Sequence, residues 1–276
     1  MSDVRVSYQG EAGAFSEEGA TGLFPEAELV PLASIRKVFE AVEVGRTDFG
    51  LVPMDNSQAG SINETYDLFL KHGLHLVGET VVRVNHCLLA LPGADMDDLK
   101  EVISHPQAVA QCEEFLSTLD VVIRADYDTA GAAKRIADDR LETMGAIASR
   151  RAGELYGLVA LAERIQTYPD NYTRFGALSR NPRALEDADK SSLVFGAGHV
   201  AGSLFRCLGA FAERHLNLTK LESRPRTGRP WEYVFYVDVE APASHPAMVD
   251  ALAEVSEHAT FTRLLGSYRS ALMRRQ

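Results

Sequence analysis

The chain has 276 residues, of which 46% are hydrophobic and 24% are charged, and its formal net charge is −11. This composition is typical of a globular protein, while the acidic balance argues against nucleic acid or an anionic membrane as a partner. No apolar run approaches the ~20 residues that span a bilayer. Because the sequence enters a strand pattern directly, without a targeting segment, we expect a cytoplasmic protein.

The first 93 residues alternate short apolar strands with amphipathic helices, which is typical of an α/β domain with a mainly parallel sheet. Strands are predicted at 5–10, 27–33 and 49–56, and helices at 15–23, 34–44 and 61–72. A longer extended stretch follows at 74–93, strand-like on both sides of Gly78. We expect this segment to cross from one lobe to another.

A second α/β unit follows, with strands predicted at 101–106, 121–127 and 144–149 and helices at 106–119, 129–140 and 150–157. The polar, proline-containing segment 181–190 has no strand pattern and is predicted to be a linker. Beyond it we predict strands and helices in the order βαββαβ, the ferredoxin-like plan. The strands are expected at 191–198, 218–226, 231–241 and 260–269, the helices at 199–216 and 245–259, and a turn at 227–230.

Three cysteines, Cys87, Cys112 and Cys207, lie far apart in the sequence. An odd, scattered set is typical of reduced thiols that serve as small buried hydrophobic residues. The spacing of these cysteines relative to the histidines and carboxylates does not match that of a metal-binding motif, so the sequence predicts no metal site.

Four polar clusters fall where strands are expected to end, at 8–15, 54–61, 104–111 and 171–175. In open α/β sheets ligands bind beyond the carboxyl ends of the strands, so position alone makes these clusters candidates for a binding site. In the first cluster, Gly10 and Gly13 would let the backbone approach an anion at a helix start. A plain tight turn is the favoured interpretation for that cluster taken alone.

The second and third clusters leave alternatives open. Ser61 followed by Glu64 fits a capping box, which leaves Asn56 and Ser57 without a structural explanation and suits them to ligand hydroxyls or carboxylates. Pro106 suits a first helical turn capped by His105 or Ser104. Gln107 and Gln111 would share one face of that helix, which either faces a cleft or is solvated.

The fourth cluster places Thr173, Arg174 and Phe175 side by side. If the ligand is an anion, the negative net charge repels it, so that a local cation such as Arg174 gains importance. The glycine-rich segment 196–202 lacks the βαβ context of a dinucleotide loop, and no G-x-S-x-G or H-E-x-x-H motif is present. A nicotinamide-dependent dehydrogenase is therefore excluded.

Together these clusters resemble the prephenate dehydratase family. The motifs YQGEAGAFS, VPMDNSQAGSINETYDL, HCLLALPG, SHPQAVAQC, DTAGAAKRIA, GAIAS and NYTRFGAL occur in the family's order, and 202–225 is similar to an ACT regulatory domain. The resemblance implies a catalytic domain over 1–180, a linker at 181–190 and an ACT domain over 191–276. The catalytic domain would be two-lobed and periplasmic-binding-protein-like, with lobes of about 1–77 plus 165–180 and about 78–164.

The resemblance further implies an active site between the lobes that needs no cofactor or metal, because aromatisation of prephenate drives the reaction. The implied catalytic residues are Thr173, Asn56, Ser104 and Gln111. The implied substrate-binding residues are Arg174, Phe175, Ser57, Gly10 and Ser61. Arg174 would pair with a substrate carboxylate or instead brace its loop.

The ACT-like region implies control by phenylalanine, bound between subunits of a homodimer or homotetramer. The residues implied for this site are Gly202, Ser203, Leu204, Asn217, Glu222, Ser223, Arg224 and Pro225. Ser203 stands where the family usually has alanine. Two alternatives remain: a related enzyme that prefers arogenate, as in plants, and an amino-acid-binding protein without chemistry.

Overall fold

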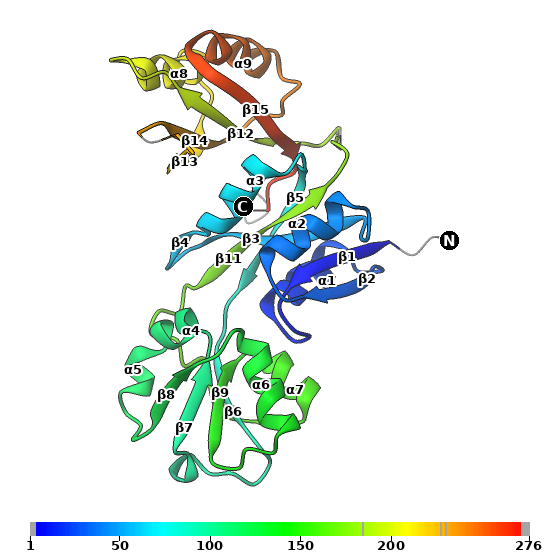
Figure 1. The fold of residues 1–276 in the computed structure, drawn as a ribbon, viewed down its shortest axis with the longest axis vertical. Coiled ribbons are helices and arrows are strands. Elements are labelled where there is room, and N and C mark those ends of the chain that lie inside the picture. Colours follow the sequence, from blue (N-terminus) through cyan, green and yellow to red (C-terminus); the bar gives the residue numbers. More distant parts are fainter. Residues whose placement is uncertain (1–3, 184, 227, 230, 272–276) are drawn as a thin grey trace. The chain divides into compact units, whose positions relative to one another are not determined.

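A computed structural model describes residues 4–183, 185–226, 228–229 and 231–271 (Figure 1). The chain forms two compact units, one of residues 1–65 and 81–175 and the other of residues 66–80 and 176–276. The predicted domain boundaries stay a prediction, and Ala184 of the linker and Thr227 and Pro230 of the expected turn lie outside the described residues. Within the described ranges, no helix combines the length and apolarity needed to cross a membrane.

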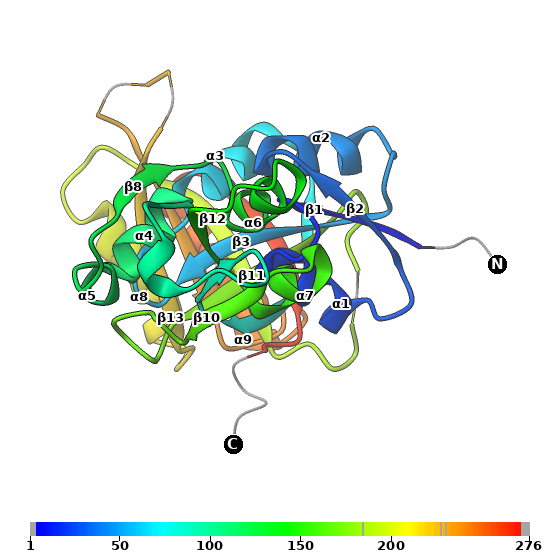
Figure 2. The ribbon, with the colours of Figure 1, turned by 90° about the horizontal axis from the view of Figure 1, so that it is seen from below.

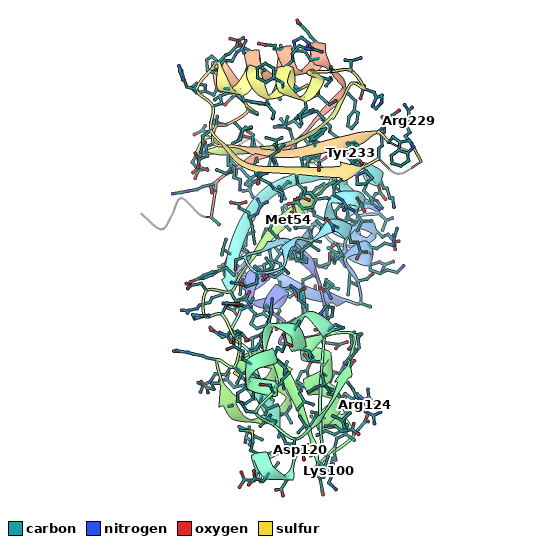
Figure 3. The ribbon with its side chains drawn as sticks, turned by 90° about the vertical axis from the view of Figure 1, so that its left-hand side faces the viewer. Met54, Lys100, Asp120, Arg124, Arg229 and Tyr233 are labelled. Carbon is teal, nitrogen blue, oxygen red and sulfur yellow. The ribbon has the colours of Figure 1, made fainter. Side chains whose placement is uncertain are left out.

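The first sheet is built around the buried strands β1 and β3, as the alternation predicted. Its order is β2 (Glu28–Leu32), β1 (Arg5–Gln9), β3 (Phe49–Asn56), β11 (Tyr172–Ser179) and β5 (His75–Arg83), with β4 (Gly60–Ser61) paired to β3. The helices that accompany it are α1 (Phe15–Leu23), α2 (Ile35–Glu43) and α3 (Asn63–Lys71). Because β1 runs parallel to β2 and β3, the carboxyl ends of these strands meet at one edge. Met54 on β3, labelled in Figure 3, is 2% exposed in this core.

The second sheet is covered on both faces. Its order is β10 (Val159–Glu163), β6 (Cys87–Ala90), β9 (Met144–Ala148), β7 (Glu101–Ser104) and β8 (Val122–Ala125), and η1 (Met96–Asp98) precedes β7. A hydrophobic cluster packs on each face of this sheet. Leu88 lies in one cluster and Leu89 in the other, as expected because successive side chains of a strand point to opposite faces. Helices α4 (Pro106–Gln111) and α5 (Glu113–Leu116) lie on one side, and α6 (Thr129–Asp138) and α7 (Arg150–Tyr156) on the other (Figures 1 and 2).

Several predicted elements differ from the observed ones. The single helix predicted at 106–119 is broken at Cys112, because the backbone N–H of Thr167 donates to the Gln111 carbonyl at 2.8 Å and takes the place of a helical donor. Strands β10 and β11 were not predicted. The chain crosses between the lobes at 84–86, between β5 and β6 and within the stretch 74–93 expected to cross, while Gly78 lies inside β5. The three cysteines are free and buried, as expected.

The loop of residues 10–14 is held by the second lobe of the same unit. Tyr156 donates to the Ala12 carbonyl at 2.8 Å, and Ser149 donates to the Gly13 carbonyl at 2.6 Å. Gly13 has φ +89°, and a Cβ there would lie 2.7 Å from Ala152 Cα. Glycine at this position therefore permits a left-handed backbone and a close approach between the lobes.

Gly10 in the same loop also serves packing. It has φ +110°, and a Cβ there would lie 2.8 Å from Asp128 Oδ2. That carboxylate accepts the backbone N–H of Glu11 at 2.8 Å. The structure therefore accounts for Gly10 by the approach of the second lobe rather than by a turn alone.

The C-terminal half of the second unit confirms the predicted ferredoxin-like plan. Its elements are β12 (Lys190–Ala197), α8 (Ser203–Ala212), β13 (Leu218–Pro225), β14 (Tyr233–Val239), α9 (Pro246–His258) and β15 (Ala259–Tyr268). The strands form an antiparallel sheet in the order β13-β14-β12-β15, and both helices pack on one hydrophobic cluster.

This βαββαβ module is tied to residues 66–80 within the second unit. Arg263 donates to the carbonyls of Phe69 at 2.6 Å and Leu74 at 2.7 Å, near the end of α3. The Lys190 ammonium lies 3.0 Å from a Glu79 carboxylate oxygen and 3.2 Å from one of Asp238, and all three side chains are buried. These contacts explain why segment 66–80 belongs to the same compact unit as the module.

We predict that Gly13→Ala destabilises the protein more than Gly93→Ala does. Gly93 has a similar φ of +92° but nothing within 4 Å of the place that an added Cβ would take, so it reports the backbone strain alone. Overpacking against Ala152 should add ~1–3 kcal/mol to that strain. Urea denaturation of both variants measures the difference, and equal unfolding midpoints would contradict the close approach at Gly13.

Candidate active site

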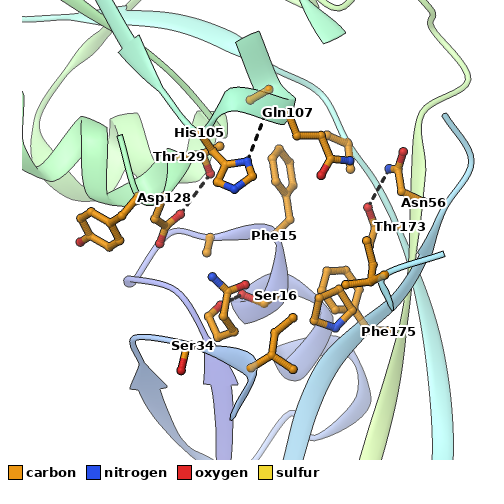
Figure 4. A pocket seen from close by; sticks show the side chains of 18 of the residues that line it. Phe15, Ser16, Ser34, Asn56, His105, Gln107, Asp128, Thr129, Thr173 and Phe175 are labelled. Atoms are coloured by element: carbon orange, nitrogen blue, oxygen red, sulfur yellow. Dashed lines mark hydrogen bonds between the residues drawn. The ribbon is translucent and has the colours of Figure 1, made fainter. Parts of the chain in front are cut away.

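A cavity of about 450 Å³ lies in the first unit, where the carboxyl ends of β1, β2, β3, β7 and β8 and the start of β11 face it (Figure 4). It is lined by Gln9, Ala14, Phe15, Ser16, Ala33, Ser34, Ile35, Pro53, Asn56, Ile62, Glu64, Val84, His86, His105, Gln107, Ala108, Gln111, Tyr127, Asp128, Thr129, Thr173 and Phe175. Figure 4 shows Asn56 and Thr173 on one side, Asp128 and Thr129 on the opposite side, and Phe15 between them. Four of the residues predicted to act on a ligand therefore share one cavity: Asn56, Gln111, Thr173 and Phe175.

Thr173 reaches the cavity from the start of β11, and not from the end of a strand as predicted. The start of β11 nevertheless meets the end of β3, where the Ser57 N–H donates to the Tyr172 carbonyl at 2.8 Å. This pairing brings the Thr173 hydroxyl to 3.0 Å from Asn56 Nδ2. The structure therefore places Thr173 beside Asn56, at the start of a strand and not after one.

The side-chain amide of Asn56 has a fixed orientation. Its Oδ1 accepts the backbone N–H groups of Gln58 and Ala59, both at 2.9 Å, and a backbone N–H can only donate. Asn56 Nδ2 is therefore the donor toward Thr173 Oγ1 and toward Asn171 Oδ1 at 2.8 Å. Since the Thr173 oxygen accepts, its own hydroxyl hydrogen remains to be donated, and it has no acceptor in the described part of the chain.

The same donor-to-acceptor order of hydrogen bonds continues from Asn56 through Asn171 to Gln111. Because Asn171 Oδ1 accepts, Asn171 Nδ2 donates, and it reaches Gln111 Oε1 at 2.9 Å. Gln111 Nε2 then points toward Asn56 Oδ1 at 3.4 Å, and His86 Nε2 lies 2.9 Å from Gln111 Oε1. His86 and Asn171 were not predicted as site residues. Both had a sequence signal, since Asn171 lies in the same polar cluster as Thr173 and His86 opens the motif HCLLALPG.

His86 is buried, with 2% of its surface exposed, and the ring of Phe15 meets it edge-on with centroids 5.5 Å apart. Burial lowers the pKa of His86, while the hydrogen bond to Gln111 opposes that shift. The imidazole is therefore neutral at neutral pH.

Other predicted residues serve the scaffold around the cavity. Ser104 is fully buried and donates to the Ile147 carbonyl at 2.6 Å, and Ser57 donates to the Asp170 carbonyl at 3.0 Å. Ser61 lies in β4 and donates to Asp55 Oδ1 at 3.2 Å. The predicted capping box at Ser61 is wrong, because α3 begins only at Asn63. None of these three, nor Gly10, is among the described residues that line the cavity.

Arg174 is engaged inside the protein. Its guanidinium donates to Asp55 Oδ2 through Nε at 2.8 Å and through Nη2 at 2.5 Å, and its side chain is only 9% exposed. Of the two roles considered for Arg174, this arrangement matches the bracing of its own strand against β3.

The alternatives for the cluster at 104–111 concerned its helix cap and its glutamines. His105 is the N-cap of α4, and its ring nitrogen Nδ1 accepts the Gln107 N–H at 3.2 Å. Gln107 and Gln111 both line the cavity.

No lysine or arginine occurs among the described residues that line the cavity, although Glu64 and Asp128 do. Burial raises the pKa of Asp128, while hydrogen bonds from the backbone of Glu11 and Ala130 oppose that shift. Positive potential comes instead from helix starts, because the first turns of α1, α2 and α6 lie at the cavity. Neutral N–H and O–H donors must therefore hold any anion there.

The βαββαβ module has a cavity of its own, of about 350 Å³. Three of the residues implied for phenylalanine binding, Gly202, Ser203 and Leu204, line it. The other predicted effector residues are not among its described lining: Asn217 donates to Glu240 at 2.6 Å, and Arg224 of β13 pairs with Asp67 at 2.9 Å. Glu222, Ser223 and Pro225 lie on β13 beside Arg224.

Comparisons with known proteins identify the family. A family model described as prephenate dehydratase matches residues 6–183. The chloroplastic arogenate dehydratase/prephenate dehydratase 2 of Arabidopsis thaliana is 46% identical over 278 residues, which cover 97% of this chain and 73% of that protein.

Two solved structures resemble nearly the whole chain. A prephenate dehydratase from Arthrobacter aurescens in complex with L-Phe is 30% identical with a TM-score of 0.88, over 97% of this chain and 90% of that one. GqqA, described as a novel type of quorum-quenching acylase, is 31% identical with a TM-score of 0.89, over 98% of this chain and 100% of that one. The ordered motifs, the two-lobed fold and these matches agree, and the chain belongs to the prephenate dehydratase family of hydro-lyases.

Proposed function

We propose that the chain catalyses the decarboxylating dehydration of prephenate to phenylpyruvate in phenylalanine biosynthesis, with the 450 Å³ cavity as its active site. One observation carries the assignment of the site. The Thr173 hydroxyl accepts from Asn56 and has its hydrogen left to donate, beside Gln111 in the same cavity. A donor held in this way suits a reaction in which an oxygen leaves with a pair of electrons.

The chemistry needs a donor more than it needs a base. The bond from the ring carboxylate to the ring carbon breaks, its electrons enter the ring as carbon dioxide departs, and the bond to the ring hydroxyl breaks at the opposite carbon. The leaving oxygen takes up one proton and becomes water. Thr173 would hydrogen-bond this oxygen or relay the proton to it. Positioning by Asn56 and Gln111 would contribute to the rate alongside it.

Charge in the cavity supports a second candidate substrate, arogenate, in which an ammonium replaces the side-chain keto group of prephenate. A dianion gains no lysine or arginine from the described lining, whereas an ammonium could approach Glu64 or Asp128. The 46%-identical plant relative carries both activities in its name. We therefore propose prephenate as the substrate and arogenate as the alternative.

Turnover of both substrates by the purified chain tests the function. We expect phenylpyruvate from prephenate or phenylalanine from arogenate, and product from neither would overturn the proposal. An acylase assay is the counter-test, since GqqA resembles the chain. No hydroxyl among the described lining residues hydrogen-bonds to a histidine, so we expect no acylase activity.

Thr173→Val is the matched site variant for that assay. Valine keeps the shape of threonine and removes the hydroxyl, and losing one well-aimed donor typically lowers kcat ~10²–10³-fold. Thr173→Ser keeps the hydroxyl and is the control, expected to remain within about 10-fold of the wild type. Near-normal turnover of the valine variant would refute the role of Thr173.

We predict that Asn56→Asp lowers kcat at least about 10²-fold, because an aspartate at this position no longer donates to Thr173 and adds a negative charge beside an anionic substrate. The control is Asn63→Asp, which makes the same chemical change at an exposed position in the first turn of α3. Steady-state kinetics of both variants measure the effect. Equal losses in the two variants would show that charge, and not the orientation of Thr173, is responsible.

We further propose that the βαββαβ module is an ACT domain that binds phenylalanine at its 350 Å³ cavity in a cytoplasmic homodimer or homotetramer. The lining by Gly202, Ser203 and Leu204 supports this, as does the bound L-Phe of the Arthrobacter aurescens relative. Two exposed aromatic residues beside the cavity, Phe205 at 78% and Trp231 at 81%, support a subunit contact there.

Added phenylalanine is expected to lower turnover, since binding at the module must favour one state of the enzyme over another to act at a second site. Alanine at the same concentration is the control and should have no effect. Turnover measured with and without each amino acid tests the proposal, together with the oligomeric state by light scattering. An active enzyme indifferent to phenylalanine would contradict it.

A further inference from the structure

His86 lies at the point where the chain crosses between the lobes, in the segment between β5 and β6. Its backbone is fixed on both sides: its N–H donates to Gln166 Oε1 at 3.0 Å, and its carbonyl accepts the Ile165 N–H at 3.0 Å. Its side chain has one hydrogen-bond partner among the described residues, Gln111. The other ring nitrogen, Nδ1, is buried and has none.

The position of the imidazole proton follows from the network. Backbone N–H groups fix Asn56, Asn56 fixes Asn171, and Asn171 donates to Gln111 Oε1. An amide oxygen carries no hydrogen and can only accept, so His86 Nε2 must carry the hydrogen that lies between it and Gln111 Oε1. Nδ1 then carries no hydrogen, which agrees with its lack of an acceptor.

The opposite tautomer would disturb the whole chain of hydrogen bonds. With the proton on Nδ1, His86 Nε2 would present a lone pair to Gln111 Oε1, and a donor on Nδ1 would be buried without an acceptor. Turning the Gln111 amide over would relieve the first conflict and would place its NH₂ against that of Asn171. Either outcome breaks a hydrogen bond of Gln111 and so loosens Gln111 and Asn171, which pack against the Asn56 amide that donates to Thr173.

We propose that His86, as the neutral Nε2–H tautomer, is a positioning residue that completes this one-directional network and so keeps the Thr173 hydroxyl hydrogen available to the leaving oxygen. The proposal rests on the proposed function for its catalytic consequence, but not for the tautomer itself. It also assigns a role to Asn171, which accepts a hydrogen bond from Asn56 and donates one to Gln111, so that the donor-to-acceptor direction is kept along the network.

The tautomer can be read without any substrate. In long-range ¹H–¹⁵N spectra of the full-length protein labelled at histidine nitrogens, the two neutral tautomers and the imidazolium give different patterns, and the signal absent from His86→Gln belongs to His86. We expect a neutral Nε2–H ring at pH 7. An Nδ1–H ring or an imidazolium would overturn the proposal.

Kinetics of two variants separate positioning from bulk structure. His86→Leu removes the donor and keeps an apolar side chain, so we expect kcat to fall about 10-fold to 100-fold with KM changed little. His86→Gln can still donate to Gln111 and should recover most of kcat. Wild-type turnover in the leucine variant, or equal losses in both variants with a raised KM, would overturn the positioning role.

Thermal unfolding identifies a leucine variant that fails to fold, and the glutamine variant and the spectra then decide the question. If the wild-type chain turns over neither substrate, the proposed function fails, while the spectra still test the tautomer of His86.

Discussion

The orientation of one side-chain amide governs the candidate site. Two backbone N–H groups, of Gln58 and Ala59, point at Asn56 Oδ1, and a backbone N–H cannot reverse its role. Every further hydrogen bond from Asn56 outward, to Thr173, Asn171 and Gln111, takes its direction from that fact. A buried network with a single allowed direction is preorganised, so the donor needs little reorientation when charge develops on a substrate.

The same site is built without side-chain cations among its described lining residues. A family that handles carboxylates would be expected to use arginine, yet Arg174 is paired with Asp55 and is not among the described residues that line the cavity. Separating Arg174 from Asp55 would leave the charge of the buried guanidinium uncompensated, which explains why Arg174 is better suited to holding β11 against β3 than to meeting a ligand. Attraction for an anion is left to helix starts and amide groups, whose fields act only at short range.

Sequence patterns reveal the fold class and which segments meet at the site, but not which side chains hydrogen-bond to one another there. Alternating apolar positions were enough to predict both α/β lobes and the βαββαβ module. The bond between His86 and Gln111 joins residues 25 positions apart, and that between Asn56 and Thr173 joins residues 117 apart, so no local pattern encodes either. Gly10 shows a related limit. A glycine signals that something approaches closely, and only the fold shows that it is the Asp128 carboxylate and not a ligand.

The ties between the βαββαβ module and residues 66–80 bear on how the two parts could be recombined. Cutting the chain in the linker would take Lys190 away from the buried Glu79, Arg224 away from Asp67, and Arg263 away from the carbonyls of Phe69 and Leu74. The residues before the linker are therefore not a unit that can be truncated or fused to a foreign domain without replacing these contacts. A transplanted module would have to bring its own cations to those three places, or else leave the two carboxylates and the carbonyls to be hydrated by water.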